Sequence, residues 1–149
     1  MIFETLQIIS VAVIGLLVGS LLTEAMILVP YWRKMKSEEF LRLHGTMGPS
    51  LYRYFAPLTI AGTVTPIITG IYSVILTPSS FSLSAVVAVL AGMMFCIYFI
   101  YFKAANESFE TGSVGVEVIP DELERWAAWH WLRVVIGLIA FSLSIAALK

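Results

Sequence analysis

The sequence predicts an all-α fold: an integral membrane four-helix bundle that forms a single domain over residues 1–149. Hydrophobic residues make up 59% of the chain and charged residues 13%, whereas soluble domains are about 45–50% apolar and about 25% charged. The mean hydropathy is +0.91. Four apolar stretches also reach the roughly 20 residues that a helix needs to cross the hydrocarbon core. The lipid bilayer is therefore the expected environment of the chain.

The predicted transmembrane helices run over about 6–31, 51–76, 83–109 and 126–148. The linker "TPSSFS" after the second helix is short, which predicts an antiparallel hairpin. The other two connections are longer and polar. In the first of them, "SEEFLRLHG" predicts a short amphipathic helix on the membrane surface, capped by Ser37 and ended by Gly45.

Lysine and arginine residues predict the orientation of the bundle, because cytoplasmic loops carry an excess of them. The side shared by the first and third connections carries Arg33, Lys34, Lys36, Arg42, Arg53, Lys103 and Arg125, and the opposite side carries Lys149. This bias predicts an N-out, C-out topology with both long loops cytoplasmic, in a membrane such as the bacterial inner membrane. The net charge of −1 gives no reason to expect a nucleic-acid partner.

Small residues and prolines predict how the helices pack. Gly15, Gly19 and Thr23 repeat every four residues, a stripe that permits close contact within the bundle or between copies in a homo-oligomer. Pro57 and Pro66 predict a kinked second helix, which leaves room for a cavity.

Two charged residues, Glu24 and Arg133, fall deep inside predicted spans, where charges are rare and usually functional. Glu24 lies eight residues before Trp32, and Arg133 lies eight residues after Arg125. Both are therefore about 12 Å from the cytoplasmic border at ~1.5 Å per residue. Opposite charges at matching depth predict an ion pair, since removing one partner of a buried pair is strongly destabilising. Such a pair can serve catalysis or can simply fix the helix register.

Further polar and aromatic residues are expected at the same depth. The candidate catalytic residues are Glu24, Asn106, His130 and Arg133, and the candidate substrate-binding residues are His44, Tyr52, Trp126 and Trp129. Glu24 or His130 can accept a proton. Arg133, with Asn106, can stabilise an enolate-like anion. The tryptophans and Tyr52 can equally form an interfacial belt, and His130 can simply hold its helix in place.

The sequence leaves the cofactor open. His44, His130 and Glu24 are candidate metal ligands, since imidazole and carboxylate suit Fe, Zn or Mn, but no spacing specific for a metal occurs. A bis-histidine haem requires His44 and His130 to meet across the bundle. A reaction without a cofactor needs a general base, an anion stabiliser and an apolar pocket, which this cluster offers. The single cysteine, Cys96, excludes a disulfide or CxxC site within one chain.

Two stretches carry a family resemblance. "GSLLTEAMILVPYW" closes the first span and "RWAAWHWLRVVIGLIAF" opens the fourth. Together with Pro57 in the second span and Asn106 in the third, they resemble the anthrone-oxygenase-like family of small four-span membrane proteins over nearly the whole chain. The resemblance implies oxidation of polyketide anthrones to anthraquinones without an obvious cofactor. It points to Glu24, Asn106, His130 and Arg133 as site residues.

A weaker resemblance, through the aromatic-proline end of the first span and "LYRYFAPLTIAG", is to small four-span protoporphyrinogen oxidases. It implies haem-linked chemistry through a first-span histidine, where this chain has Glu24 instead. The leading hypothesis is an oxygenase-like membrane oxidoreductase that acts on a hydrophobic aromatic or quinone-like molecule at the cytoplasmic end of the bundle. The alternatives are a haem- or metal-binding membrane protein and a non-catalytic membrane subunit or ligand-binding protein.

Overall fold

Four helical rods make up the computed structural model, which describes residues 1–76 and 82–148. The first rod consists of α1 (Ile2–Thr23), η1 (Glu24–Leu28) and α2 (Val29–Trp32), the second of α3 (Ser37–Leu76), the third of α4 (Leu83–Ile97), η2 (Tyr98–Phe102) and α5 (Lys103–Thr111), and the fourth of η3 (Val116–Val118) and α6 (Ile119–Ala146). Each rod is long and apolar enough to cross a membrane. The predicted all-α membrane four-helix bundle is thereby confirmed.

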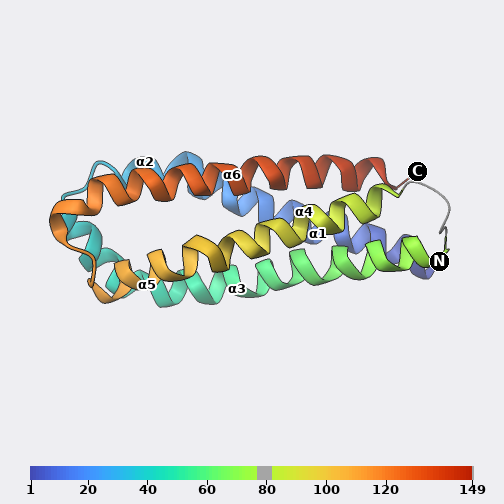
Figure 1. Cartoon of the computed structure of the whole chain (residues 1–149), viewed down its shortest axis with the longest axis horizontal. Coiled ribbons are helices and arrows are strands. Elements are labelled where there is room, and N and C mark those ends of the chain that lie inside the picture. Colours follow the sequence, from blue (N-terminus) through green and yellow to red (C-terminus); the bar gives the residue numbers. More distant parts are fainter. Residues whose placement is uncertain (77–81, 149) are drawn as a thin grey trace.

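The rods pack in a ring, in which α1 touches α3 and α6, and α4 touches the same two helices. The connections 33–36 and 112–115 lie at one end of the bundle, which we call the loop end, and both termini lie at the other (Figure 1). The two polar connections therefore share an end, as expected. The linker predicted over 77–82 falls largely outside the described residues, but α3 and α4 on either side of it pack as neighbours.

The first connection is shorter than predicted, because α3 continues through the segment expected to form a separate surface helix. Gly45, its expected end, lacks the positive φ of a glycine cap, which Gly112 at the end of α5 does have, at 67°. A Cβ at Gly45 would lie 3.5 Å from the Glu110 carbonyl oxygen, an ordinary van der Waals distance, so Gly45 faces α5 without ending the helix. The segment is thus corrected to the first turns of α3, which bends near the loop end (Figure 1).

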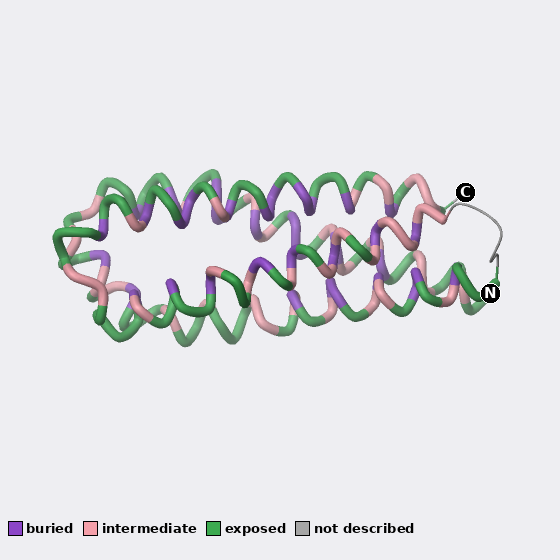
Figure 2. The backbone as a smooth tube through the Cα atoms, in the orientation of Figure 1, coloured by how far each residue is buried: buried purple, intermediate pink, exposed green. Residues whose placement is uncertain are grey.

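The distribution of buried residues fits a bundle surrounded by lipid. Buried positions gather on the sides of the rods that face one another, and exposed positions lie outside (Figure 2). The outward positions include large apolar side chains such as Leu16, Ile75 and Ile100, which are 62%, 69% and 70% exposed. Such an apolar surface would be unfavourable in contact with water, but it is compatible with the hydrocarbon core of a membrane.

Glycines set the closest helix contacts in the half of the bundle near the termini. A Cβ at Gly70 on α3 would lie 2.6 Å from the Cβ of Ala88 on α4. Within the predicted small-residue stripe, a Cβ at Gly15 would lie 2.9 Å from the Phe141 ring, whereas Gly19 has nothing within 4 Å. The stripe therefore serves the bundle at Gly15, and its role in a homo-oligomer stays a prediction.

Candidate functional site

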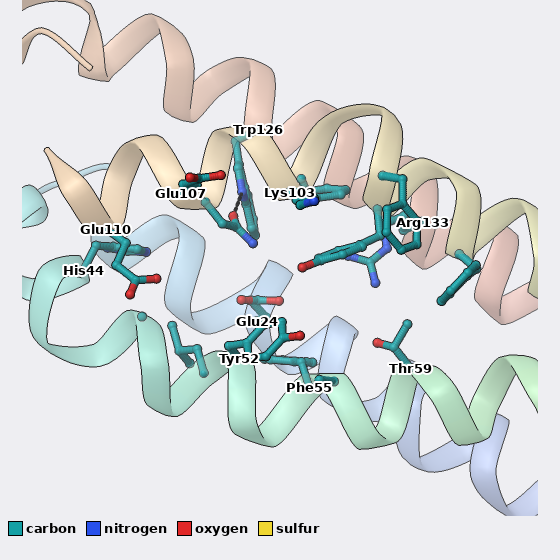
Figure 3. A pocket seen from close by; sticks show the side chains of 18 of the residues that line it. Glu24, His44, Tyr52, Phe55, Thr59, Lys103, Glu107, Glu110, Trp126 and Arg133 are labelled. Atoms are coloured by element: carbon teal, nitrogen blue, oxygen red, sulfur yellow. Dashed lines mark hydrogen bonds between the residues drawn. The ribbon is translucent and has the colours of Figure 1, made fainter. Parts of the chain in front are cut away.

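A cavity of about 360 Å³ lies among the rods near the loop end. Its walls come from every rod and are lined by Glu24, Trp32, His44, Gly48, Leu51, Tyr52, Phe55, Ala56, Thr59, Ile60, Phe95, Tyr98, Phe99, Phe102, Lys103, Asn106, Glu107, Glu110, Trp126 and Arg133. Glu24 occupies the middle of the close-up view, with Tyr52, Phe55 and Thr59 of α3 across from Lys103 and Arg133 (Figure 3). The cavity is mostly aromatic and aliphatic, with a few ionisable groups, as is typical of small-molecule pockets.

Two π-helical segments flank the cavity at the same level. η1 begins with Glu24, and η2 supplies Tyr98, Phe99 and Phe102. In η1 the backbone N–H of Val29 donates to the Glu24 carbonyl, five residues back. Pro30 follows at once and has no N–H, and its ring would crowd the carbonyl four residues earlier in a regular α-helix. The wider turn relieves that crowding, and such turns occur frequently at functional sites.

Glu24 pairs with a histidine rather than with the expected arginine. Its side chain lies on the cavity wall and is 7% exposed as a residue. Within the described part of the chain, the basic side chain within 4 Å of the Glu24 carboxylate is His130, at 3.6 Å between Oε2 and Nε2, a contact that is an ion pair only when His130 is protonated. Arg133 lines the same cavity without forming an ion pair with Glu24. Matching depth thus brought the two residues to one space, but not into contact.

His130 lies behind the cavity wall, fully buried. Its Nε2 is 2.9 Å from the carbonyl oxygen of Leu21, and since a carbonyl only accepts, Nε2 donates this hydrogen bond. The imidazole stacks on Trp126 at 4.8 Å and 18°, and Trp126 Nε1 donates to Asn106 Oδ1 at 2.9 Å. His130 therefore packs against Trp126 and lies beside the Glu24 carboxylate, and of these two ionisable side chains it is Glu24 that lines the cavity.

Arg133 offers a buried hydrogen-bond donor that no group among the described residues accepts. The residue is 6% exposed and its Cζ lies 4.8 Å from the centre of the Phe102 ring. Its buried Nε has no hydrogen-bond partner among the described residues. Burying a charged donor without partners is costly. An acceptor on a bound molecule would satisfy it.

Five rings close the cavity towards the loop end; we call them the aromatic plug. They are Trp32, Phe40, His44, Phe109 and Trp126. Ring centres lie 4.1 Å apart for Phe40 and His44, 5.1 Å for Phe40 and Phe109, and 5.8 Å for Trp32 and Trp126. All five residues are buried, so the plug fills the space between the rods at that end, while the exposed side chains of Glu107 and Glu110 line the rim of the cavity beside it.

Six of the eight predicted site residues line this cavity: Glu24, His44, Tyr52, Asn106, Trp126 and Arg133. The other two do not. His130 lies behind the wall, and Trp129 stacks instead on Tyr101 at 5.4 Å, away from the cavity.

Sequence reasoning missed much of the lining on the third rod. Phe95, Tyr98, Phe102 and Glu110 were not predicted, and with the predicted Asn106 they recur at intervals of three and four residues. That spacing marks one face of a helix. This spacing can be seen in the sequence, but it does not stand out there because the residues between these positions are also mostly apolar. The acids of this rod, Glu107 and Glu110, also line the cavity.

The predicted metal ligands do not form a metal-binding group. Among the described residues, no cluster of three or more His, Cys, Asp or Glu side chains is close enough to hold an ion. Glu24 and His130 are neighbours, but His44 belongs to the aromatic plug. The cavity wall includes His44 and not His130, so the two imidazoles do not face one space as a bis-histidine haem would require.

Comparison with known proteins adds no family to this geometry. No family model matches the chain, and neither the curated proteins nor the solved structures contain a match. The resemblance to anthrone oxygenases therefore stays a prediction. What is established is an integral-membrane-type four-helix bundle with one aromatic-walled cavity of substantial size among the described residues.

Proposed function

We propose that the protein is an oxygenase-like membrane oxidoreductase whose substrate is a flat hydrophobic molecule, aromatic or quinone-like, held in the cavity near the loop end. One observation carries the proposal. Glu24 and Arg133, both more than nine-tenths buried, face a single aromatic-walled cavity without pairing with each other. A carboxylate and a guanidinium separated in this way can act on two different atoms of one ligand.

The reaction begins with a proton transfer. A suitable substrate has a CH₂ group between aromatic rings, conjugated to a ring carbonyl, as an anthrone has. Glu24 removes one proton from that carbon, and negative charge develops on the carbonyl oxygen. Arg133 stabilises this charge by donating hydrogen bonds in a site that excludes water. His130, held by Leu21 and Trp126, fixes the position of the carboxylate.

Molecular oxygen is the oxidant that balances the step. The enolate carbon adds O₂, and loss of water converts CH₂ to C=O, so that R₂CH₂ and O₂ yield R₂C=O and H₂O. Carbon loses four electrons and O₂ gains four, with one oxygen atom retained in the product. The cavity of about 360 Å³ falls within the roughly 300–1,000 Å³ of small-molecule sites.

The test is anthrone oxidation by the purified protein in lipid nanodiscs, followed by oxygen consumption and anthraquinone absorbance. Glu24→Gln should lower kcat by about 10²–10⁴-fold, the usual contribution of a general base. Arg133→Gln should lower it by about 10²–10³-fold, as for loss of an anion-stabilising donor. The matched controls are Glu38→Gln and Arg42→Gln, at exposed positions away from the cavity, and both should keep wild-type rates.

Other results would favour the alternatives. Anthrone binding that weakens in Arg133→Gln, without turnover in the wild type, would indicate a non-catalytic ligand-binding protein. A haem spectrum or stoichiometric metal in the purified protein would favour the haem- or metal-binding hypothesis. Full activity in Glu24→Gln would refute the proposed base.

The proposal extends to orientation. We infer that the loop end faces the cytoplasm in a bacterial inner membrane, since seven of the nine lysine and arginine side chains flank its connections, including Lys34, Lys36 and Arg125. A membrane-impermeant thiol reagent should therefore label a cysteine at Lys36 in inverted vesicles and not in intact spheroplasts. Labelling in spheroplasts would reverse the orientation.

A further inference from the structure

We infer that the cavity takes its ligand sideways from the bilayer, through an opening between α3 and the η2–α5 part of the third rod. The inference rests on the proposed function in one respect, that the cavity holds a hydrophobic small molecule. It adds the source of that molecule: a compound dissolved in the membrane, and not one that arrives through water at the loop end.

The first support is that buried rings fill the route along the bundle axis from the loop end. The aromatic plug fills the space between the rods there. α3 and α5 also meet tightly beside the plug, since a Cβ at Gly48 would lie 3.1 Å from Glu110 Oε2. A flat ligand of several rings cannot pass without displacing buried aromatic side chains.

The second support is that the side of the cavity is open. Seven of the described residues that line it are exposed. The apolar part of this rim is Tyr52 and Ile60 on α3, at 60% and 55%, and Phe99 on η2, at 54%; the polar part, towards the loop end, is Lys103, Asn106, Glu107 and Glu110 on α5. A side chain that both lines a cavity and is exposed lies at its mouth. α3 packs against α4 and α5 on either side of this level, so the opening is bounded at both ends (Figure 3).

The third support is the depth of the mouth. Phe99 lies about 24 Å along its rod from Leu83, and Ile60 lies about 24 Å from Leu76, at ~1.5 Å per residue. The hydrocarbon core is about 30 Å thick, so both residues fall within it, near the loop-end boundary. Lys103 and Asn106, one turn and two turns beyond Phe99, line the same cavity at that boundary. The mouth thus admits a molecule with an apolar ring body and a polar edge.

The experiment measures access directly and uses no substrate. Cys96 is replaced by Ser, and Thr59→Cys places one thiol on the buried inner wall of the cavity. The protein in phosphatidylcholine nanodiscs is treated with pyrenylmaleimide, which partitions into lipid, or with a sulfonated maleimide, which stays in water. We expect modification by the first reagent and protection from the second, with complete reaction of both in dodecyl sulfate.

Three further variants locate the path. Phe99→Ala widens the mouth and should raise the pyrenylmaleimide rate several-fold. Ile100→Ala, its neighbour outside the cavity, and Phe109→Ala, which thins the plug, should leave the rate unchanged. Equal reaction with the sulfonated reagent, no reaction with either reagent, or acceleration by Phe109→Ala alone would each overturn lateral access. Since no anthrone is present, lateral access can hold while the proposed oxidation fails, or the reverse.

Discussion

The two buried histidines provide a paired test of which polar contacts hold the bundle together. Both His130 and His44 stack on an aromatic ring, Trp126 at 4.8 Å and Phe40 at 4.1 Å. The Nδ1 of each ring is buried without a hydrogen-bond partner among the described residues, and the two differ in that His130 Nε2 donates to the Leu21 carbonyl at 2.9 Å. Replacing each by Phe keeps a ring of similar shape and removes only the polar atoms.

The magnitudes differ because the lost contacts differ. His130→Phe leaves the Leu21 carbonyl without its side-chain donor, which costs about 1–3 kcal/mol when a buried acceptor is left unsatisfied. The backbone N–H of Glu24 also points at this carbonyl, which favours the lower half, about 1–2 kcal/mol. His44→Phe removes an unsatisfied nitrogen and should be neutral or stabilise by up to ~1 kcal/mol.

The assay is equilibrium unfolding in mixed micelles of dodecyl sulfate and a mild detergent, followed by far-ultraviolet circular dichroism. This signal reports helix content and is insensitive to the tryptophan environment that both variants alter. We expect His130→Phe to unfold at a lower dodecyl sulfate fraction than wild type and His44→Phe at an equal or higher fraction. The reasoning is refuted if His44→Phe is destabilised as much as His130→Phe.

Three further outcomes are expected in the same unfolding titration. Gly70→Ala should destabilise the protein by about 1–3 kcal/mol through overpacking, because the added Cβ would lie 2.6 Å from Ala88 Cβ and 2.9 Å from the Ser84 carbonyl oxygen. Gly92→Ala, with nothing within 4 Å, should be neutral or up to ~1 kcal/mol more stable, and equal values for the two would contradict close α3–α4 packing. Tyr101→Phe removes the 2.7 Å hydrogen bond to Glu122 Oε1 and should cost about 0.5–1.5 kcal/mol, whereas no loss would mean that water replaces it. Arg33→Ala breaks an exposed 3.2 Å pair with Glu124 and should cost less than ~1 kcal/mol, so a larger loss would assign this pair a structural role.

Hydropathy was enough to predict the four rods, because a span must be long and apolar whatever its neighbours are. Periodicity on the fourth rod was also informative, since residues three and four apart share a helix face. Trp126, His130 and Arg133 are indeed all buried on α6. The predicted depth of Glu24 was useful too, because it lies on the same cavity as Arg133.

Contacts between rods could not be predicted in the same way. Depth counting assumes a regular rise and says nothing of how a helix is rotated about its axis. The π-helical turn that begins at Glu24 changes that rotation, and His130 rather than Arg133 becomes the partner. The continuation of α3 past Gly45 depends on packing against Glu110, a contact 65 positions further along the chain.

The two ends of the bundle suggest why the charged residues are present at all. Near the termini, rods are joined by hydroxyl groups, as in the 2.8 Å contact between Ser10 and Thr69. Neutral contacts of this kind are enough to fix helix register in a membrane and carry a small desolvation cost. If Glu24 and Arg133 served only that purpose, they should pair with each other, since an unpaired buried charge is strongly destabilising. They face a common cavity instead, and Arg133 keeps a buried donor without a partner. The proposed ligand would supply an acceptor to Arg133 and a proton to Glu24, and would thereby give both residues a reason to face the cavity.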